Sequence, residues 1–258
     1  MSFALVTGAS FGIGEALAAR LAAGGHDLVL VARTKERLEA LAARLREQHG
    51  RTVHVVPADL SDPAAPEAVF DATRALGVEV DVLVNNAGFG SNGPFIEQDP
   101  SREAAMVQVN VTALMLLCRY FVPGMVARGR GRVLNIGSTA GFQPGPFMAT
   151  YYATKAFVLS FSEALAHEVA DSGVTVTCAC PGATASEFAT RSGNEDSRLF
   201  KQRKPASAED VAEHAYEAMK RGDRVAVHGA LNAVGAFSVR LSPRRLVTSI
   251  AASLNAKA

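Results

Sequence analysis

The chain has 258 residues, of which 48% are hydrophobic and 20% charged, a balance far from that of disordered or membrane-spanning proteins. This length lies within the range in which one α/β domain keeps a single core, so we expect one domain over residues 1–258. The 26 basic and 25 acidic side chains leave a formal net charge of +1, which provides no electrostatic reason to expect nucleic acid or an anionic membrane as a partner.

Short β-branched apolar runs alternate along the chain with longer stretches of helical periodicity. This alternation is typical of βαβ units and a parallel sheet. Strands are predicted at residues 3–7, 27–32, 53–57, 80–85, from about 132 to 138, 173–180 and 224–228. The pattern predicts an α/β protein with a single-domain Rossmann fold: a doubly wound parallel sheet of about seven strands, with helices on both faces.

Six helical stretches connect the predicted strands. Glycines predict where some of them end, and Pro63 and Ser207 predict where others begin. The predicted helices are residues 15–25 closed by Gly24-Gly25, a helix with an apolar face of Leu38, Leu41 and Leu45, one opening at Asp62-Pro63, residues 101–128, residues 149–171 closed by Gly173, and residues 207–221.

Two segments fall outside this alternation. The irregular stretch from Pro181 to Pro205 is long for a compact domain, which predicts a substrate lid over about residues 183–204. A helical tail is expected over about residues 230–258. Because it carries few charges, we favour a solvated or subunit-packing helix over a membrane or partner anchor.

The glycine-rich sequence TGASFGIG lies between the first predicted strand and the first predicted helix and contains Gly8, Gly12 and Gly14. A phosphate needs backbone N–H groups that point toward it without an intervening Cβ, and the dipole of a helix N-terminus adds favourable charge. Any tight strand-to-helix turn also favours glycine. The strand, turn, helix and strand within the first 32 residues favour a dinucleotide site.

Arg33 follows the second predicted strand, where many nicotinamide-binding folds carry an acidic residue that accepts a hydrogen bond from the adenosine ribose. An arginine there would instead pair with a 2′-phosphate, which favours NADP(H), with NAD(H) still possible. The alternative is that Arg33 is a solvated residue at a strand end.

Several motifs together resemble the compact, single-domain short-chain dehydrogenase/reductase family. They occur in the family's order over nearly the whole chain, through about Val227. They are TGASFGIG at 7–14, Asp59 in ADL, NNAG at 85–88, Asn110, Ser138, YYATK at 151–155, and Pro181-Gly182.

The resemblance implies a cofactor site and assigns residues to it. Asp59 would meet the adenine, Asn85 would stabilise the sheet, and Pro181 would border the nicotinamide. The implied cofactor-binding residues are Thr7, Gly8, Ser10, Gly12, Ile13, Gly14, Arg33, Asp59, Leu60, Asn86, Ala87, Gly88, Tyr151, Lys155, Pro181, Gly182 and Thr184.

Three residues depart from the family's pattern. Phe11 stands where NADP-preferring relatives often carry a basic side chain, so the NADP prediction depends on Arg33. Ser186 replaces a threonine that is frequent five residues after Pro181, and its cofactor contact is in doubt. Gly137 replaces a second serine, which leaves Ser138 as the serine of the motif.

The doubled tyrosine in YYATK raises the question of which one is an acid. Reduction of a carbonyl leaves an alkoxide that must be protonated, and a tyrosine with a pKa near 10 needs a nearby ammonium to lower its pKa. Residues four apart on a helix share a face, which sets Lys155 beside Tyr151, whereas Tyr152 points about 100° away toward packing, substrate or another subunit.

These considerations assign catalytic roles to four residues. Tyr151 is the expected acid/base, Lys155 lowers its pKa and holds the nicotinamide ribose, and Ser138 orients the carbonyl. Asn110, in the manner of the family, would anchor a water that links Lys155 to solvent. For any one of these residues alone, packing or capping is the alternative.

The expected function is therefore an NADP(H)-dependent oxidoreductase that interconverts a carbonyl and an alcohol. A non-catalytic NADP-binding sensor on the same fold is an alternative, because fold does not fix function. An epimerase or dehydratase is a third, which the absence of an added substrate domain disfavours. Aromatic residues that could line the pocket suggest an apolar or mixed substrate: Phe89, Phe95, Phe142, Phe188 and Phe200.

The remaining expectations concern location, assembly and metals. The N-terminus lacks a basic region before its apolar stretch, which favours the cytoplasm, and a homodimer or homotetramer is expected. No histidine cluster has metal-ligand spacing, and Cys178 and Cys180, one residue apart, lack the usual zinc spacing. We expect both thiols to be buried on one face of a strand and predict no metal.

Overall fold

A computed structural model describes residues 2–185, 187–194, 196–198 and 205–256 of the chain. Its regular elements follow the alternation seen in the sequence. The strands are β1 (Phe3–Thr7), β2 (Asp27–Ala32), β3 (Val53–Pro57), β4 (Val80–Asn85), β5 (Gly131–Ile136), β6 (Val174–Cys180) and β7 (Val225–Val227). The longer helices are α1 (Gly12–Ala23), α2 (Lys35–His49), α3 (Ala65–Ala75), α4 (Pro100–Val107), α5 (Leu114–Ala127), α6 (Ala149–Glu168), α7 (Glu187–Ser192), α9 (Ala208–Arg221), α10 (Ala230–Ser238) and α11 (Arg244–Asn255).

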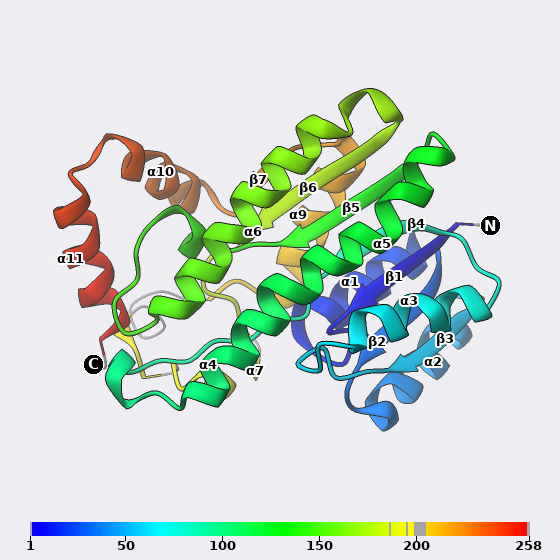
Figure 1. The fold of residues 1–258 in the computed structure, drawn as a ribbon, viewed down its shortest axis with the longest axis horizontal. Helices are drawn as coiled ribbons and strands as arrows, with labels where there is room; N and C mark the ends of the chain where they lie inside the picture. Colours follow the sequence, from blue (N-terminus) through cyan, green and yellow to red (C-terminus); the bar gives the residue numbers. More distant parts are fainter. Residues whose placement is uncertain (1, 186, 195, 199–204, 257–258) are drawn as a thin grey trace.

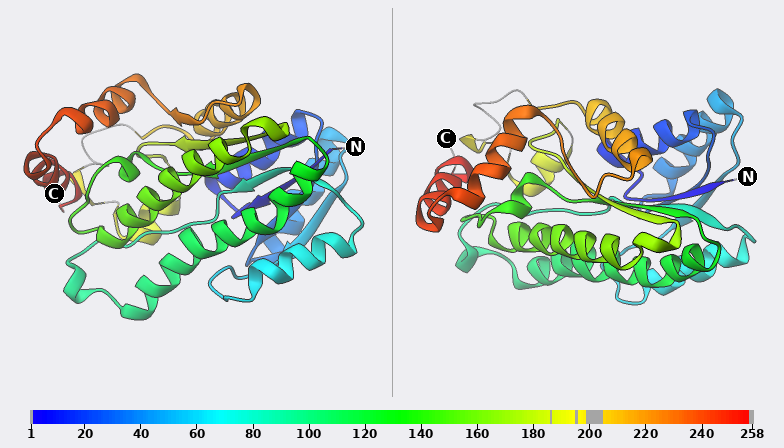
Figure 2. Two further views of the ribbon diagram at one scale, coloured as in Figure 1. Left: turned by 45° about the horizontal axis from the view of Figure 1, so that its top comes forward. Right: turned by 90° about the horizontal axis from the view of Figure 1, so that it is seen from above.

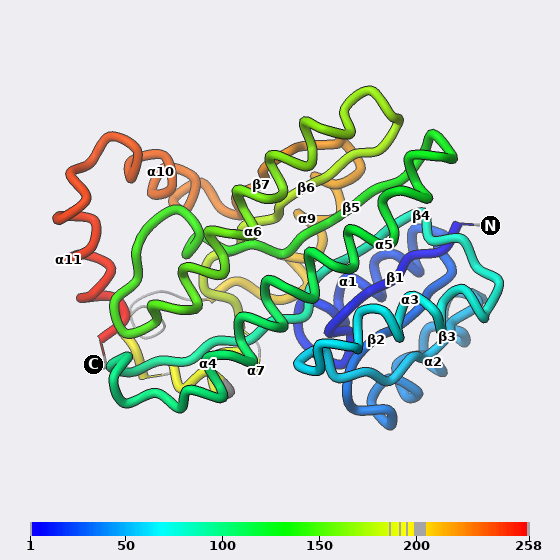
Figure 3. Tube along the Cα trace, viewed as in Figure 1, coloured from blue at the N-terminus to red at the C-terminus, as the bar shows by residue number. Residues whose placement is uncertain are grey.

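The seven strands form one parallel sheet in the order β3-β2-β1-β4-β5-β6-β7. The order reverses between β1 and β4, where the chain changes direction across the sheet, so the predicted doubly wound parallel sheet is confirmed. Figure 1 shows the strands side by side, and Figure 3 traces the chain from one end of the molecule to the other.

Helices cover both faces of the sheet, as Figure 2 shows most clearly in its right-hand view. Side chains alternate along β1: Ala4 and Val6 join one core with α1, α2 and α9, and Leu5 joins the other with α3, α5 and α6. Because both faces are covered, the central strands are largely apolar, and β2 is buried at all six positions.

Most predicted boundaries agree with the structure within a few residues, and the start of α3 differs for a local reason. The helix expected to open at Asp62-Pro63 begins at Ala65, because the Asp62 carboxylate accepts from the Ala64 N–H and closes a turn before it. Ser207 caps α9 as expected, its hydroxyl accepting from the Asp210 N–H at 3.0 Å.

The long helix predicted at residues 101–128 is interrupted. It runs as α4, a π-helical segment η2 (Gln108–Ala113) and α5. Among the described residues, the run 100–127 is the one helix long and apolar enough to cross a membrane, and half of its apolar window is buried inside the protein. Its apolar side chains, such as Leu117 and Met125, fill the core beneath β4 and β5.

Cys178 and Cys180 are fully buried on the same face of β6, with their sulfur atoms 3.7 Å apart, as the alternation of a strand predicts. Both thiols pack into the core shared by α5 and α6.

A buried polar chain crosses this otherwise apolar core. The Asn85 amide donates to Asn135 Oδ1 at 2.9 Å, and the Asn135 amide donates to the Ser162 hydroxyl at 2.9 Å. These contacts join β4 to β5 and β5 to α6. Buried polar groups cost free energy unless they are paired, so the chain fixes how α6 sits on the sheet.

We expect Asn135→Ala to lower the free energy of unfolding by about 3 kcal/mol, because it removes one hydrogen bond from each of two buried side chains, Asn85 and Ser162, and opens a cavity. Urea denaturation measures the change. Thr177→Val is the matched control: this buried hydroxyl has no partner among the described residues, so its removal should cost less than about 1 kcal/mol. Equal losses of unfolding free energy in the two variants would contradict the stabilising role of the Asn85–Asn135–Ser162 hydrogen bonds.

Candidate active site

A cavity of about 540 Å³ lies at the carboxyl ends of the parallel strands, where the strand order reverses. Crevices at this point of a doubly wound sheet are where ligands bind. Most of the residues singled out from the sequence line it: Gly8, Ser10, Gly12, Ile13, Arg33, Asp59, Leu60, Asn86, Ala87, Gly88, Ser138, Tyr151, Lys155, Pro181, Gly182 and Thr184.

Three of the predicted residues lie behind the wall instead. The Thr7 hydroxyl, buried at the end of β1, accepts from the N–H groups of Asn86 and Ala87 at 3.0 and 3.1 Å. A Cβ on Gly14 would lie 2.2 Å from the carbonyl oxygen of Gly8. Thr7 and Gly14 therefore shape the turn, and Asn110, the third, is described below.

The glycine turn has the backbone that its composition predicted. Gly8 and Gly12 have φ values of +64° and +59°, a region that favours glycine. Gly12 and Ile13, the first residues of α1, line the cavity, and the side chain of the N-cap residue, Phe11, makes no capping hydrogen bond. The uncapped N-terminus of a twelve-residue helix, preceded by glycines, matches the arrangement that binds phosphate.

Arg33 lies at the opposite wall, just after β2, with 65% of its side chain exposed. Its guanidinium is 4.0 Å from the carboxylate of Asp59. Partial burial acts to raise the pKa of Asp59, but hydrogen bonds from Ser61 and the charge of Arg33 outweigh it, and the pKa lies below its ordinary value. The Arg33 side chain therefore stays largely exposed at the wall of the cavity.

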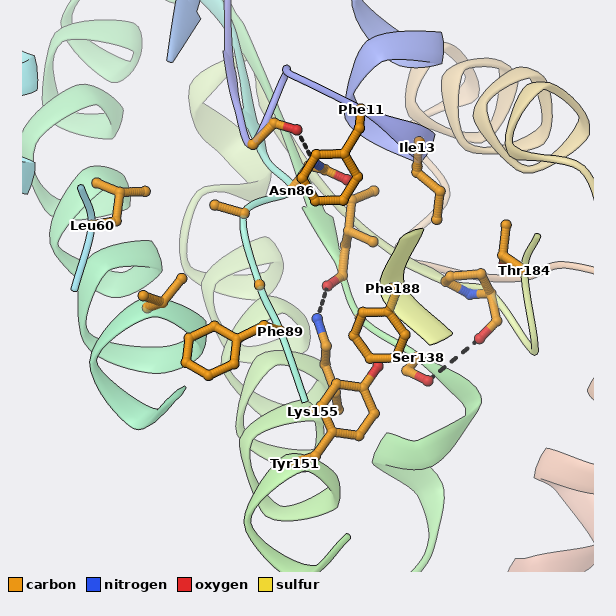
Figure 4. Close-up of a pocket in the computed structure, with 18 of the residues that line it drawn as sticks. Phe11, Ile13, Leu60, Asn86, Phe89, Ser138, Tyr151, Lys155, Thr184 and Phe188 are labelled. Carbon is orange, nitrogen blue, oxygen red and sulfur yellow. Dashed lines mark hydrogen bonds between the residues drawn. The ribbon is translucent and has the colours of Figure 1, made fainter. Parts of the chain in front are cut away.

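Tyr151, Ser138 and Lys155 converge at the other end of the cavity (Figure 4). Tyr151 and Lys155 lie one turn apart on α6, and Ser138 lies two residues after the end of β5. The Ser138 hydroxyl lies beside that of Tyr151 and donates to the carbonyl oxygen of Pro181 at 3.5 Å. Desolvation raises the pKa of Tyr151 above its ordinary value, and the neighbouring Ser138 hydroxyl only partly offsets this.

The Lys155 ammonium is buried beside this pair. It donates to the carbonyl oxygen of Ile136 at 2.7 Å and lies 5.9 Å from the centre of the Tyr151 ring. Burial lowers the pKa of Lys155 to about 8, although the charges of the nearby Cys178 and Cys180 act to raise it. The spacing of four residues does place the two side chains together, as predicted. Burial, and not the ammonium, dominates the pKa of the tyrosine.

Asn110 sits in the π-helical segment, and such segments are frequent at functional sites. Its amide donates to the carbonyl oxygen of Phe89 at 2.9 Å and to the Thr154 hydroxyl at 3.1 Å, and its Oδ1 accepts from the Phe89 N–H. A Cβ on Gly88 would lie 3.1 Å from Asn110 Oδ1 and 3.7 Å from Lys155 Nζ. Asn110 therefore pins the loop after β4 against α6, close to Lys155.

Tyr152 turns away from Lys155, as the helical spacing predicted, and packs against the C-terminal helix. Its hydroxyl donates to Asn255 Oδ1 at 3.1 Å, and the Asn255 amide donates to the carbonyl oxygen of Pro146 at 3.0 Å. The Asn92 amide also donates to the Asn255 carbonyl oxygen at 3.1 Å. The fully buried Asn255 thus ties three segments of the cavity wall to the end of α11.

Helix α7 covers the cavity from the side of the predicted lid. The Phe188 ring lies 5.4 Å from that of Tyr151, and Glu187 pairs with Arg37 of α2 at 3.0 Å. Ser186 and Phe200, both considered from the sequence, lie outside the described residues. Phe89 and Phe188 line the cavity, whereas Phe95 is exposed and Phe142 packs in the core.

Sequence reasoning missed Arg102 of α4 and Asn194, which also line the cavity. The Arg102 guanidinium lies 5.4 Å from the centre of the Phe89 ring and donates to the carbonyl oxygen of Gly90. Neither residue stands in a motif, and a single polar side chain on an amphipathic helix gives no signal in the sequence.

The family profile described as short chain dehydrogenase matches residues 2–197. The chain belongs to the short-chain dehydrogenase/reductase family. The 7β-hydroxysteroid dehydrogenase of Collinsella aerofaciens is 36% identical over 180 residues, which cover 70% of this chain and 68% of that protein. A very-long-chain 3-oxoacyl-CoA reductase of Anas platyrhynchos is 37% identical over 186 residues, 70% of this chain and 59% of that protein.

Solved structures of the family match over more of the chain. A short-chain dehydrogenase from Sphingobium yanoikuyae, in complex with NADPH, superposes with a TM-score of 0.84 at 37% identity, covering 93% of this chain and 94% of that one. The chain spans only a little over half of the length of the very-long-chain 3-oxoacyl-CoA reductases that it matches. The resemblance to those reductases is therefore to part of each protein.

The buried Lys155 ammonium predicts that the free energy of unfolding of this short-chain dehydrogenase depends on pH. With a folded pKa of about 8 against an ordinary 10.5, Lys155 destabilises the fold by about 3 kcal/mol at about pH 7. The unfolded chain binds more protons between these two pKa values, so this cost falls as pH rises through that window. Relative to Lys155→Met, the wild type should gain about 2 kcal/mol of unfolding free energy between about pH 7 and about pH 10.

Chemical denaturation of both proteins at the two pH values checks this. Lys220→Met, at an exposed lysine paired with Glu217, is the matched control and should leave the pH dependence of the wild type unchanged. A difference in unfolding free energy between wild type and Lys155→Met that stays constant with pH would refute the buried charge.

Proposed function

We propose that this chain is an NADP(H)-dependent oxidoreductase that interconverts a ketone or aldehyde with the corresponding alcohol. The observation that carries the proposal is the meeting of Ser138, Tyr151 and Lys155 at one end of a cavity whose other end is the glycine turn after β1. Binding of NADPH by the Sphingobium yanoikuyae relative supports the cofactor assignment.

The residues present fit a dinucleotide phosphate. Gly8 and Gly12 keep side chains out of the turn, and the uncapped start of α1 offers backbone N–H groups to an anion. The exposed Arg33 guanidinium, after β2, suits a 2′-phosphate, and Asp59 beside it suits the adenine. Lys155, at the far end, would hold the nicotinamide ribose. When bound, the nicotinamide supplies or accepts the hydride.

Tyr151 is the proposed acid. Because burial raises its pKa, the hydroxyl keeps its proton at neutral pH and can give it to an alkoxide oxygen as that oxygen develops charge. In the oxidative direction the same oxygen must accept a proton, which needs a lower pKa. The ammonium of Lys155, 5.9 Å from the ring, favours the phenolate and so helps in that direction.

Ser138 is the proposed orienting group. Its hydroxyl lies beside that of Tyr151, accepts from the Ala140 N–H at 3.1 Å and donates to the Pro181 carbonyl oxygen at 3.5 Å. These contacts hold its oxygen beside the tyrosine oxygen, where both hydroxyls can reach one carbonyl oxygen. Two donors directed at the same oxygen stabilise the negative charge that develops there during reduction.

The substrate end of the cavity supports an apolar, bulky substrate. Its wall beside Tyr151 is formed by Phe89, Met148, Tyr152 and Phe188. These side chains offer apolar surface, while Arg102 and Asn194 provide a few polar contacts, a combination common in ligand pockets. The 7β-hydroxysteroid dehydrogenase among the relatives acts, by its name, on a molecule of this kind.

The expected homodimer or homotetramer and the cytoplasmic location stay predictions.

The convergence of the hydroxyls and the ammonium favours the enzyme over the non-catalytic sensor. A panel of steroid, aryl and aliphatic ketones, assayed with NADPH and NADH by loss of nicotinamide absorbance, tests the proposal. Tight NADPH binding without turnover of any substrate would favour the sensor instead.

Two neighbouring tyrosines provide the sharpest test of the acid. Tyr151→Phe should lower kcat by roughly 10²- to 10⁴-fold, because general acid catalysis contributes this much, while NADPH binding persists. Tyr152→Phe removes only the hydrogen bond to Asn255, so it should keep most of the turnover and lose about 1 kcal/mol of stability. Comparable losses of kcat in both variants would remove Tyr151 from the mechanism.

The cofactor preference depends on Arg33. Arg33→Ala should weaken NADPH binding roughly 10- to 100-fold and leave NADH binding unchanged, since only NADPH carries the 2′-phosphate. The chain contains no tryptophan, so the fluorescence of the bound nicotinamide reports the Kd directly. Arg44→Ala, which breaks a surface pair with Glu15, serves as control. If Arg33 is only a solvated residue, Arg33→Ala would instead change the binding of neither NADPH nor NADH.

A further inference from the structure

Exposed apolar side chains gather at one end of the molecule. Of the twelve large apolar residues that are exposed in the described chain, eight lie on four neighbouring segments: α10, the turn η5 (Val239–Leu241), α11 and the turn η1 (Phe95–Glu97). We call these four segments the C-terminal face. Its exposed apolar residues are Phe95, Ile96, Leu231, Val234, Phe237, Leu241, Leu246 and Ile250.

Packing within one chain does not account for the apolar side chains on the helices of this face. Helix α10 has no buried residue, although Leu231, Val234 and Phe237 follow each other at helical spacing and are 78%, 68% and 62% exposed. On α11 the buried residues are Val247, Ala251 and Asn255, while the exposed Leu246 and Ile250 point away from the chain. A helix keeps such an apolar stripe when another surface covers it.

The face joins two segments of opposite charge. Arg244 and Arg245 begin α11, and no acidic residue follows Asp223 in the sequence. Glu97 and Asp99 lie in and just after η1, beside the exposed Phe95 and Ile96. Neither Arg244 nor Arg245 has an ion-pair partner among the described residues.

The acidic segment lies next to the far end of α11. The Asn92 amide donates to the Asn255 carbonyl oxygen, and residues 92–94 and 255–256 border one small hollow. Helix α11 has twelve residues and is therefore about 18 Å long, so the basic and acidic ends of the face are separated by its length. Figure 1 shows α11 and the chain before α4 at this same end of the molecule.

We propose that the C-terminal face binds a second copy of this chain about a two-fold axis that crosses the middle of α11. In a two-fold contact the same surface meets itself in reverse, so the two α11 helices run antiparallel. Leu246 of each copy then packs near Ile250 of the other. The basic start of each α11 meets the acidic η1 segment of the other copy, and the apolar stripe of α10 is covered.

The charge pattern favours this occupant over a lipid surface. An anionic membrane attracts Arg244 and Arg245, and also the exposed Arg240 of η5, but repels Glu97 and Asp99, which lie on the same face. A second copy satisfies both signs at once, because each interface contains two equivalent basic-to-acidic contacts. The interface is independent of the proposed chemistry, although Asn255 links α11 to the cavity wall through Tyr152.

Charge reversal at each end of the face tests the interface. The Arg244→Glu, Arg245→Glu double variant and the Glu97→Arg variant should each raise the dissociation constant of the dimer roughly 100-fold, because like charges then meet twice. Asp99 is left intact because its carboxylate caps α4. Light scattering after gel filtration should report half of the wild-type mass for both variants, with NADPH binding retained.

Mixing the two variants provides the decisive measurement. In the mixed dimer one contact places the introduced glutamates against the introduced arginine, and the other contact is that of the wild type. The mixture should therefore regain the wild-type mass. Arg74→Glu, an exposed reversal on α3, is the control and should change no mass.

Three results would overturn the interface: a wild-type mass that neither variant lowers, a mixture that stays dissociated, or a wild-type monomer. Cosedimentation of such a monomer with phosphatidylglycerol vesicles, lost in the double arginine variant, would assign the face to a membrane instead.

Discussion

The hydrogen bond from the buried Lys155 ammonium to the carbonyl oxygen of Ile136 is the interaction on which the candidate active site depends. It ties α6 to the end of β5, and Ser138 follows β5 by two residues. The register between helix and strand therefore sets the distance between the hydroxyls of Tyr151 and Ser138. A buried ammonium without this acceptor would be far more costly, so the site and its local fold stabilise each other.

The polar groups around this bond form a continuous frame. Asn135 and Ser162 fix α6 to the sheet on one side, and Asn110 fixes the loop after β4 on another. On the far side of the cavity the Thr7 hydroxyl joins the ends of β1 and β4. Apolar packing tolerates small shifts, whereas each of these buried polar pairs has a narrow geometry. The frame explains how a cavity at the edge of a sheet can hold three reactive groups in place.

The two ends of the cavity have different surroundings. The glycine turn and Arg33 belong to the first half of the sheet and form an open, polar wall. The substrate side is closed by α7 and by the C-terminal helix through Asn255. The substrate wall thus combines residues before β6, such as Met148 and Tyr152, with segments after β6, which are far from the cofactor wall in sequence. Variation in those segments can change the substrate without disturbing the turn that suits a phosphate.

The sequence by itself determined the alternation of strands and helices, the glycine turn and the shared face of Tyr151 and Lys155, because these depend on periodicity and local backbone preferences. It could not place Arg102 or Asn194 at the cavity or reveal the π-helical turn that carries Asn110. Only the tertiary structure decided that Asn255 holds Tyr152 and that burial dominates the pKa of Tyr151. Contacts between residues about a hundred positions apart, and the loss of solvent that accompanies them, arise from packing and leave no periodic signal in the chain.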